Sequence, residues 1–580
     1  MSTERGLCGL AAEAAAAFGE AVAQRFPERG GWRERTFTEL DHATSRVAGL
    51  LREGGVRRGD RVALLCRTRP EWTVCDLAIA RLGAICVPVY PTGSRGQIRW
   101  ILHDSGATAV LVETDGHLAD IEALRDELPA LELVLGIDAT GSPLTEVINS
   151  GTGAADLGPV PEPAPDDPFT IVYTSGTSGT TGEPKGCVLT HHNVASVIGA
   201  LREISEAAPG DVLFAYLPLA HLLTRMLQVY CLRTGATIAY SGGDIRAVAG
   251  ELAEVAPTYL PSAPMLFEKI YSVVSGLAPD LGPTVELGLR ARRGEQLDEA
   301  EARRFADAEE QLFGRVRAAF GGRLGHAITG SAPIAPEILE FFFACGVPVY
   351  EAYGMTESTA VLTSNTPDAW RVGTVGRAAP GVELAIAEDG EVLGRSAGVF
   401  AGYWNNPAAT AESVVDGWLR TGDLGSLDAD GFLTITGRKK DIVITSAGKN
   451  LSPAAIETDL RRTPWIAEAV LLGDRRPYPV ALLALDQDRL PELTSETGVD
   501  PAAEGWSGDE RLRALIAREV EAVNARYSPP ERIRDFAIVP APFSVAAGEL
   551  TPTLKIRRDV VARRHAELVE TLYPAPRRAT

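Results

Sequence analysis

Short apolar runs alternate with longer segments of helical periodicity along the first part of the chain. Residues 62–66, 84–89 and 108–112 are short and apolar, which is typical of buried strands. Between them, residues 72–82 and 97–104 carry apolar side chains at helical spacing. Strands that alternate with helices in this way predict an α/β architecture with a largely parallel sheet.

The pattern changes near residue 438, which indicates a domain boundary. Residues 431–437 are predicted to form one arm of a hairpin, and a polar run and a new apolar strand at 442–445 follow it. The rest of the chain has its own succession of strands and helices and is long enough for a small domain. We therefore expect an N-terminal domain at 1–438 and a C-terminal domain at 439–580.

The composition is that of a soluble globular protein. Of the 580 residues, 45% are hydrophobic and 23% are charged, and no apolar run reaches the ~20 residues of a membrane helix. The alanine-rich stretch at 10–23 has no basic region before it, so we predict a surface helix there rather than a signal peptide. Seven scattered cysteines, without a CxxC pair or a Cys/His cluster, predict reduced, buried thiols, no zinc site and a cytoplasmic location.

Charge narrows the possible functions. The net charge of −21 argues against a general nucleic-acid binder, which would carry a basic face. Any anionic ligand must then be held by backbone N–H groups and a few placed cations. Only six basic residues are lysines, and we interpret those in glycine-rich or charged motifs as marking positions where the rigid fork of Arg would not serve. These motif lysines are Lys185, Lys439, Lys440, Lys449 and Lys555.

The most informative motif is a loop rich in Gly, Ser and Thr that follows a predicted strand at 171–173. The loop, TSGTSGTTGEPKG at 174–186, can surround an anion with consecutive N–H groups, while its hydroxyls add donors and Lys185 adds a cation. The pattern is typical of polyphosphate binding, and the strand before it argues against a flexible linker. It is not a Walker A loop, because Gly186 follows the lysine. The residues expected to bind phosphate are Thr174, Ser175, Gly176, Thr177, Ser178, Gly179, Thr180, Thr181, Gly182 and Lys185.

This loop and the motifs downstream of it resemble those of the adenylate-forming superfamily, which includes acyl-CoA synthetases, luciferases and the adenylation domains of peptide synthetases. Its phosphate loop is similar to YTSGTTGxPKG. The further matches, in the family's order, are YGMTE at 353–357, TGD at 421–423, GRKKD at 437–441 and a C-terminal lysine at Lys555. The segments at 217–226 (LPLAHLLTRM) and 549–558 (ELTPTLKIRR) look most like bacterial long-chain fatty acyl-CoA synthetases.

The resemblance implies a fold and an activity. It implies a large N-terminal adenylate-forming domain built of α/β subdomains and a smaller, mobile α+β C-terminal domain that swings about a hinge at Lys440. It also implies an acyl-CoA synthetase that uses ATP, Mg²⁺ and coenzyme A. A hydrophobic carboxylic acid, long-chain or bulky, would attack the α-phosphate of ATP, and the CoA thiol would then attack the acyl-adenylate.

The resemblance also assigns nucleotide-binding roles. Tyr353, followed by Gly354, would stack on adenine, and Asp423 and Arg438 would contact the ribose. The small residues Gly330, Ser331 and Ala332 would let adenine and the acyl group pass close to the backbone.

Further residues are expected to act on the reacting groups. Thr356 and Glu357 resemble the family's phosphate- and Mg²⁺-binding pair, since a hard cation prefers oxygen ligands. Lys555 would reach the α-phosphate and the carboxylate. After rotation of the C-terminal domain, Gly448 and Lys449 would replace it and line the path of the CoA arm. His221 would lie beside the acyl pocket and the thiol's path, although a structural histidine that caps a helix is equally compatible.

One motif departs from the family. The phosphate loop has three extra residues, an apparent duplication of Ser-Gly-Thr at 175–177 and 178–180. An insert of that length could displace the loop by up to roughly 10 Å, and a misplacement of about 1 Å can reduce a rate by ~100-fold. In one interpretation, the extra residues form a bulge that leaves the phosphate site intact. Alternatively, adenylation fails and the protein only thioesterifies an acyl-adenylate that a separate adenylating enzyme supplies.

Two other functions stay open at this point. The acyl group could be loaded onto a carrier protein instead of CoA, or the chain could be a non-catalytic protein that binds adenylates or CoA. Retention of Glu357, Asp423, Arg438, Lys440 and Lys555 argues against the non-catalytic alternative.

Overall fold

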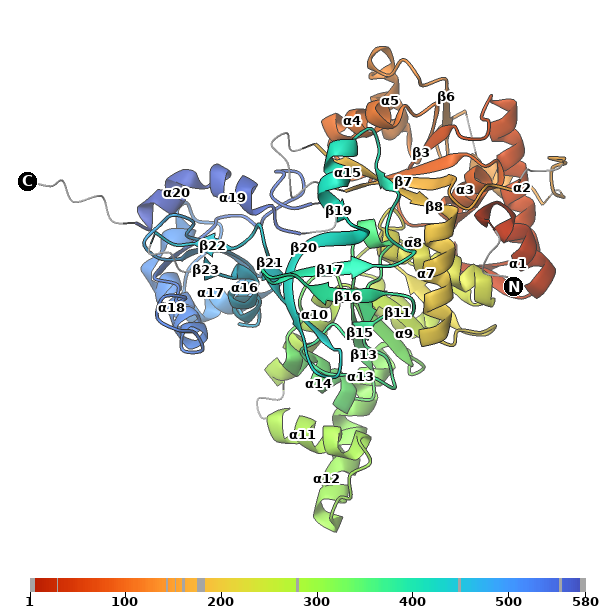
Figure 1. Ribbon diagram of the computed structural model, residues 1–580. Coiled ribbons are helices and arrows are strands. Elements are labelled where there is room, and N and C mark those ends of the chain that lie inside the picture. Colours follow the sequence, from red (N-terminus) through yellow and green to blue (C-terminus); the bar gives the residue numbers. More distant parts are fainter. Residues whose placement is uncertain are drawn as a thin grey trace, which may run out of the picture.

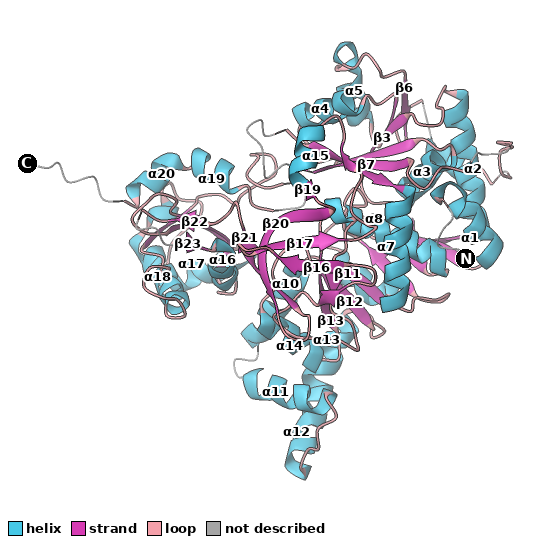
Figure 2. Cartoon of the chain, in the orientation of Figure 1, coloured by secondary structure: helices cyan, strands magenta, loops and turns pink. Residues whose placement is uncertain are grey.

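The computed structural model describes residues 6–28, 30–141, 144–151, 153–158, 162–174, 183–277, 281–446, 450–551 and 555–573. The N-terminal part contains two large sheets with helices between and around them, and the C-terminal part, blue in Figure 1, lies to one side. Secondary structure is mapped in Figure 2.

The first large sheet has seven strands in the order β18-β8-β7-β4-β3-β5-β6. Their bounds are β3 (Arg61–Leu65), β4 (Ile85–Val89), β5 (Ala109–Val112), β6 (Leu133–Gly136), β7 (Pro168–Thr174), β8 (Lys185–Thr190) and β18 (Gly402–Tyr403). Strands β3 to β7 are parallel, while β8 and β18 add antiparallel edges. The predicted strands at 62–66, 84–89 and 108–112 are confirmed, as are the helices between them, α3 (Pro70–Arg81) and α4 (Arg95–Ser105).

The second large sheet has nine strands in the order β15-β14-β13-β12-β11-β9-β10-β1-β2. Their bounds are β1 (Val22–Glu28), β2 (Gly31–Thr36), β9 (Val212–Ala215), β10 (Thr237–Tyr240), β11 (Tyr259–Ser262), β12 (His326–Thr329), β13 (Val349–Tyr353), β14 (Thr363–Ser364) and β15 (Arg377–Ala378). The centre of this sheet is parallel, from β10 through β9, β11 and β12 to β13. The prediction of an α/β fold is therefore confirmed.

The predicted N-terminal helix at 10–23 is shorter than expected. Helix α1 (Leu10–Phe18) ends at Gly19, which has a φ of +49°, and Ala23 instead belongs to strand β1. The helix also buries Leu10, Ala11 and Ala14 against the core, so it is not a purely surface element.

Two helices, α3 and α8 (Leu222–Thr234), connect the two large sheets. Both are buried almost all round, and one hydrophobic cluster contains their side chains together with those of β3, β4, β9 and β10. Arg225 on α8 donates to Asp76 on α3 through Nε at 2.9 Å and Nη2 at 2.5 Å, and to the Thr170 hydroxyl on β7 at 2.7 Å. The buried guanidinium of Arg225 thus links α8 to α3 and to β7, and we call this set of hydrogen bonds the Arg225 tie.

A smaller sheet follows the nine-stranded one and leads to the predicted boundary. It contains β16 (Glu383–Ile386), β17 (Glu391–Arg395), β19 (Val414–Val415), β20 (Trp418–Leu427) and β21 (Leu433–Arg438). β20 and β21 form an antiparallel hairpin, which confirms the predicted arm at 431–437.

The C-terminal part has its own core. Strands β24 (Ile466–Leu472), β25 (Val480–Leu485) and β26 (Asp535–Ile538) form one sheet, and β22 (Val443–Ile444) pairs with β23 (Asn450–Leu451). Two hydrophobic clusters cover the sheet and are built only from C-terminal residues. Its helices are α16 (Pro453–Arg461), α17 (Leu490–Thr497), α18 (Glu510–Asn524), α19 (Arg558–Arg564) and α20 (Ala566–Thr571).

The other helices surround the sheets of the N-terminal part. They are α2 (Phe37–Glu53), α5 (Asp115–Glu122), α6 (Leu144–Asn149), α7 (His191–Ile204), α9 (Val248–Val255), α10 (Pro264–Leu277), α11 (Leu281–Arg292), α12 (Glu299–Ala308), α13 (Gly314–Ala319), α14 (Pro336–Ala344) and α15 (Pro407–Ser413). Within the ranges given above, none of the helices combines the length and apolar character needed to cross a bilayer. All seven cysteines are buried free thiols, as predicted.

The Arg225 tie can be tested by a substitution that keeps side-chain length. We expect Arg225→Met to lower the free energy of unfolding by ~3–5 kcal/mol, because it leaves the Asp76 carboxylate buried without its partner. Urea denaturation followed by circular dichroism measures this change. The matched control is Arg303→Met, whose exposed ion pair with Glu299 spans 3.8 Å; it should change the free energy by less than ~0.5 kcal/mol. Equal losses in the two variants would contradict the role of the tie.

Candidate active site

The register of β20 and β21 places a carboxylate opposite a guanidinium. Asp423 pairs with Arg438, and the Arg438 Nε lies 3.1 Å from the Asp423 Oδ1. The Tyr353 hydroxyl, at the end of β13, donates to Oδ2 at 2.7 Å. Burial and the adjacent Asp423 raise the pKa of Tyr353 well above its usual value, so the phenol stays protonated and donates. Both oxygens of Asp423 are thus oriented by neighbours.

Lys555 comes from the C-terminal part and lies in the same site. Its backbone N–H donates to the Thr551 hydroxyl at 3.0 Å, and the Thr551 N–H donates to the Lys555 carbonyl at 2.8 Å. Burial, together with Arg438, lowers the pKa of the Lys555 ammonium to about 8, and the carboxylates of Asp423 and Glu357 partly oppose this shift. The structure therefore brings Lys555 close to Asp423, Arg438 and Glu357, which the sequence analysis also predicted to be site residues.

Glu357 occupies a short 3₁₀ turn, Thr356–Ser358, that follows β13. Its carboxylate is buried, and Oε1 accepts a hydrogen bond from the Tyr403 hydroxyl at 2.7 Å. The Phe400 N–H donates to the Glu357 carbonyl at 2.9 Å, which fixes the turn against the strand that carries Tyr403. Lys185 approaches the other side of this cluster, with its Nζ 5.2 Å from the centre of the Tyr403 ring.

Tyr403 is a site residue that the sequence analysis missed. It lies on the two-residue strand β18, which pairs with β8 and places it opposite Cys187. A lone tyrosine far along the chain from Lys185 and 46 residues from Glu357 carries no local signal of this position. Only the sheet pairing brings it between the two charged groups.

Backbone geometry around the site is unusual. Ser331, Thr359 and Ala360 have φ values of +71°, +53° and +78°, a region that residues other than glycine rarely occupy. Gly354 is required by packing, because a Cβ there would lie 2.2 Å from the Ala360 carbonyl oxygen. A Cβ at Gly330 would likewise lie 2.7 Å from the carbonyl oxygen of a neighbouring strand. The expected small residues thus allow backbone segments to approach each other at the site.

The phosphate loop joins the two strands of a hairpin. β7 pairs with β8 in a register that places Tyr173 opposite Gly186 and Thr174 opposite Lys185. The Pro184 carbonyl accepts a hydrogen bond from the Trp100 indole at 3.0 Å. Both ends of the loop are therefore positioned by the sheet and by α4. The expected phosphate-binding residues at 175–182, and Gly448 and Lys449, lie outside the described residues.

Lys439, the residue before the predicted hinge at Lys440, is bonded to the N-terminal part. The Lys439 N–H donates to the Gly422 carbonyl at 2.8 Å, and its ammonium lies 2.5 Å from Asp389 and 3.2 Å from Glu391. Burial and the nearby Lys185 lower the pKa of Lys440. Backbone pairing with the N-terminal part is thus present up to the residue before Lys440.

His221 lies at the start of α8 and within electrostatic reach of Lys555. It occupies the N-cap position, but its side chain makes no capping hydrogen bond. Burial, together with Lys555, lowers the pKa of His221 to about 4, so the imidazole is neutral near pH 7. The structure therefore disfavours the helix-capping alternative for this histidine.

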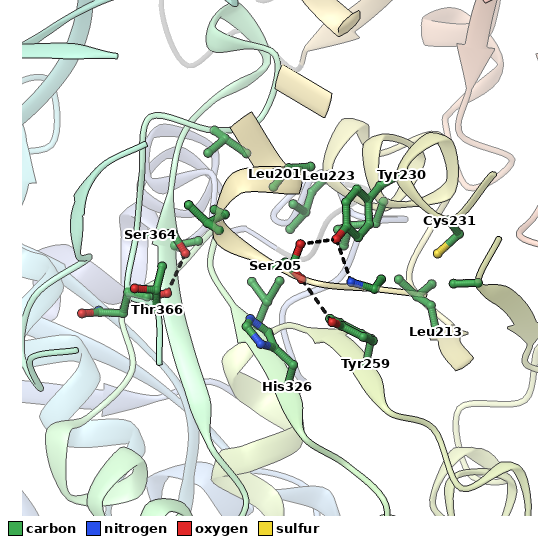
Figure 3. A pocket seen from close by; sticks show the side chains of 18 residues that line it. Leu201, Ser205, Leu213, Leu223, Tyr230, Cys231, Tyr259, His326, Ser364 and Thr366 are labelled. Carbon is green, nitrogen blue, oxygen red and sulfur yellow. Dashed lines mark hydrogen bonds between the residues drawn. The ribbon is translucent and has the colours of Figure 1, made fainter. Parts of the chain in front are cut away.

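The same part of the chain contains an apolar pocket (Figure 3). It lies between α7 and α8 on one side and β9, β11, β12 and β13 on the other, and it includes Leu223, Leu227 and Val361. Ile328, two residues before Gly330, and Ala352, next to Tyr353, line its end near the site. The pocket thus reaches the carboxyl ends of β12 and β13, the edge at which open α/β sheets bind ligands.

The lowered pKa of Lys555 can be measured directly, because the chain has only six lysines. After reductive methylation with ¹³C-formaldehyde, we expect one methyl resonance to titrate near pH 8, with the amine charged below and neutral above this value. The variant Lys555→Arg should lack this resonance. Lys439, whose ion pairs raise its pKa, serves as the internal comparison and should titrate above the usual lysine range. A Lys555 resonance that titrates with the exposed lysines would contradict the buried position.

Comparison with known proteins agrees with this geometry. The family model of the AMP-binding enzymes matches residues 11–404, and that of the AMP-binding enzyme C-terminal domain matches residues 440–576. The chain is 37% identical to long-chain-fatty-acid–CoA ligase FadD15 of Mycobacterium bovis, over 94% of this chain and 93% of that protein. It is 30% identical to human long-chain-fatty-acid–CoA ligase 6, over 92% of this chain and 81% of that protein.

Solved structures extend the agreement to the fold. The crystal structure of the anthranilate CoA ligase AuaEII in complex with anthranoyl-AMP matches with a TM-score of 0.75 at 22% identity, over 99% of each chain. The expected architecture, a large N-terminal α/β part followed by a small C-terminal part, is confirmed. Because family models match both parts, the chain belongs to the AMP-binding enzyme family, as its motifs predicted.

Proposed function

We propose that the protein is an acid–thiol ligase that activates a hydrophobic, long-chain carboxylic acid with ATP and transfers the acyl group to coenzyme A. The observation that carries this proposal is the convergence of Lys555 with Asp423, Arg438 and Glu357. An apolar pocket borders the carboxyl ends of β12 and β13, and β13 also carries Tyr353. The similarity to long-chain-fatty-acid–CoA ligases supports the same substrate class.

The cluster on β13, β20 and β21 would bind the nucleoside. Asp423, oriented by Tyr353 and Arg438, would accept hydrogen bonds from the ribose hydroxyls, while the half-exposed Arg438 would add a donor. The ring of Tyr353 would lie against the adenine. Gly330, Ser331 and Ala332 would pass close to the base and the acyl group.

Lys555 would stabilise the charge that develops when the carboxylate attacks the α-phosphate. Its ammonium is present below its pKa of about 8, and phosphate would further favour the charged form. Because the lysine is buried, its interaction with that charge is stronger than it would be in water.

Thr356 and Glu357 fit a magnesium ion by the chemistry of their oxygens. A buried carboxylate oriented by Tyr403 suits a cation that takes one or two protein carboxylates and otherwise phosphate oxygens. When bound with ATP, the ion would offset the negative charge of the leaving pyrophosphate. Lys185 would lie near the ion as well, because its Nζ is close to the ring of Tyr403, whose hydroxyl bonds Glu357.

The pairing of the two strands at the ends of the phosphate loop favours a complete, two-step enzyme. Thr174 and Lys185 are paired in the sheet, so three extra residues between them lengthen the loop without displacing its ends. Lys185 can then occupy the same position as in a shorter loop. We therefore propose that adenylation is retained, and that the thioesterification-only function is the second candidate.

The second half-reaction would require a rotation of the C-terminal part about Lys440. The Lys439 N–H is bonded to β20, and a hinge after it needs only a few residues to absorb the change in dihedral angles. The rotation would break the contacts of Ser452 with Thr436, of Arg462 with Glu337 and of Asp488 with Lys269. Gly448 and Lys449 would then replace Lys555. The neutral His221, near Lys555 at the start of α8, would lie beside the entering thiol and the acyl group.

The test separates the two half-reactions. We expect ATP–pyrophosphate exchange with long-chain fatty acids, and thioester release when a synthetic acyl-adenylate is supplied with CoA. Lys555→Gln should lower exchange by ~10²–10³-fold, the usual effect of removing one donor to a developing charge, while leaving thioester release intact. Lys449→Gln is the reciprocal control and should reduce thioester release only. Loss of both activities in both variants would contradict the division of roles.

Deletion of residues 175–177 tests the phosphate loop by restoring the family's spacing. We expect exchange to change by less than ~3-fold, because both ends of the loop are fixed by the hairpin register. A wild-type enzyme without exchange that gains it on deletion would instead support the thioesterification-only function. Unchanged thioester release from acyl-adenylate serves as the control for folding.

A further inference from the structure

In the part of the chain that the structure describes, the imidazole of His326 lies in the wall of the apolar pocket without a hydrogen bond to another residue. His326, the first residue of β12, lines the pocket together with Ile328, while Ala327 between them packs into the core on the other face of the sheet. Among the described residues, neither ring nitrogen of His326 has a hydrogen-bond partner or a charged neighbour. Burial lowers the pKa of His326 to about 4, so the neutral ring offers one donor and one acceptor.

The ring is held between two tyrosines. Its centre lies 5.4 Å from that of Tyr259, at an interplanar angle of 26°, and 4.8 Å from that of Tyr350. Tyr259 is also the cross-strand neighbour of His326, so strand pairing and ring packing together fix the imidazole. Figure 3 shows the two labelled rings side by side below Ser205.

The hydroxyls of Tyr230, Ser205 and Ser364 in the pocket wall already have hydrogen-bond partners. The Tyr230 hydroxyl donates to the Ser205 carbonyl at 2.7 Å and accepts from the Ala207 N–H at 3.1 Å. The Ser205 hydroxyl donates to the Tyr259 oxygen at 3.2 Å, and among the described residues the Tyr259 proton has no acceptor. His326 and Tyr259 are therefore adjacent groups with hydrogen-bonding capacity to spare inside an apolar wall.

The distance of His326 from Gly330 determines which part of an acyl chain would lie beside the imidazole. The histidine begins β12, and Gly330 is the residue that follows the end of this strand. At ~3.3 Å per residue, the distance along the strand is roughly 13 Å. If the carboxylate lies near Gly330, as in the function proposed above, His326 faces the middle of a long acyl chain rather than either end.

We propose that the pocket selects an acyl chain that carries a hydroxyl or keto oxygen near its middle, and that His326 is the specificity-determining residue. This inference rests on the proposed function for the position of the carboxylate. An unsubstituted chain would cover the imidazole and leave its polar atoms unpaired, whereas a chain oxygen would accept from its N–H. Sites built in this way discriminate against the analogue that lacks the oxygen.

The test compares matched acids. We expect kcat/KM for adenylation to be at least ~10-fold higher for a stearic acid with a hydroxyl or keto group near the middle of its chain than for stearic acid itself. Moving the oxygen close to the carboxylate or to the methyl end should abolish this preference. The hydroxyl and keto acids distinguish an oxygen that also donates from one that only accepts.

Variants show whether His326 is responsible. His326→Phe keeps the ring packing against Tyr259 and Tyr350 and should remove the preference, with kcat/KM for stearic acid unchanged or higher. His326→Gln keeps hydrogen-bonding atoms and should retain part of the preference. Leu227→Met, on the opposite wall of the pocket, is the matched control and should leave the ratio unchanged.

Direct binding distinguishes failure of this inference from failure of the proposed function. Calorimetric titration of each acid into the protein without ATP should show the same preference and the same dependence on His326. Equal affinity and equal kcat/KM for the plain and oxygenated acids would overturn the inference and leave the ligase function intact. Tighter binding of the oxygenated acid without any exchange would support the pocket's selectivity and overturn the adenylation step.

Discussion

The buried guanidinium of Arg225 joins the elements from which the candidate active site is built. It connects α8 to Asp76 on α3 and to Thr170 on β7. β7 leads into the phosphate loop, and α8 begins at His221 and forms one wall of the apolar pocket. Because a buried charge must keep its partners, strand β7 and the pocket wall formed by α8 are held at a fixed separation.

The site itself is assembled from two parts of the chain. The N-terminal part supplies the oriented carboxylate of Asp423, the turn at Glu357 and the end of the phosphate hairpin, and the C-terminal part supplies Lys555. In a protein of net charge −21, the cations of the candidate site are few and partly buried. That placement strengthens each interaction with phosphate and confines it to one location. It also makes the site dependent on the position of the C-terminal part.

The phosphate loop and the apolar pocket bear on different parts of the proposed function. The loop bears on whether adenylation occurs, and the hairpin that closes it argues that the added residues are accommodated between fixed ends. The pocket bears on which acid is used, and the unpaired imidazole of His326 distinguishes it from a uniformly apolar tunnel. The two features lie on different sheets, so each can be varied by substitutions that do not touch the other.

The sequence by itself determined the α/β architecture, the strands at 62–66, 84–89 and 108–112, the change of pattern near residue 438 and the family motifs, because these are local properties of spacing and residue type. It did not determine where α1 ends, since Gly19 permits the turn but pairing of β1 with β10 requires it. The positions of Tyr403 and His326 were decided only by the tertiary structure. Tyr403 donates to Glu357 because the pairing of β18 with β8 brings it there, and His326 faces a pocket whose other wall comes from α7 and α8. Contacts between residues that are distant in sequence produce no local periodicity. They can therefore be identified only in the folded structure.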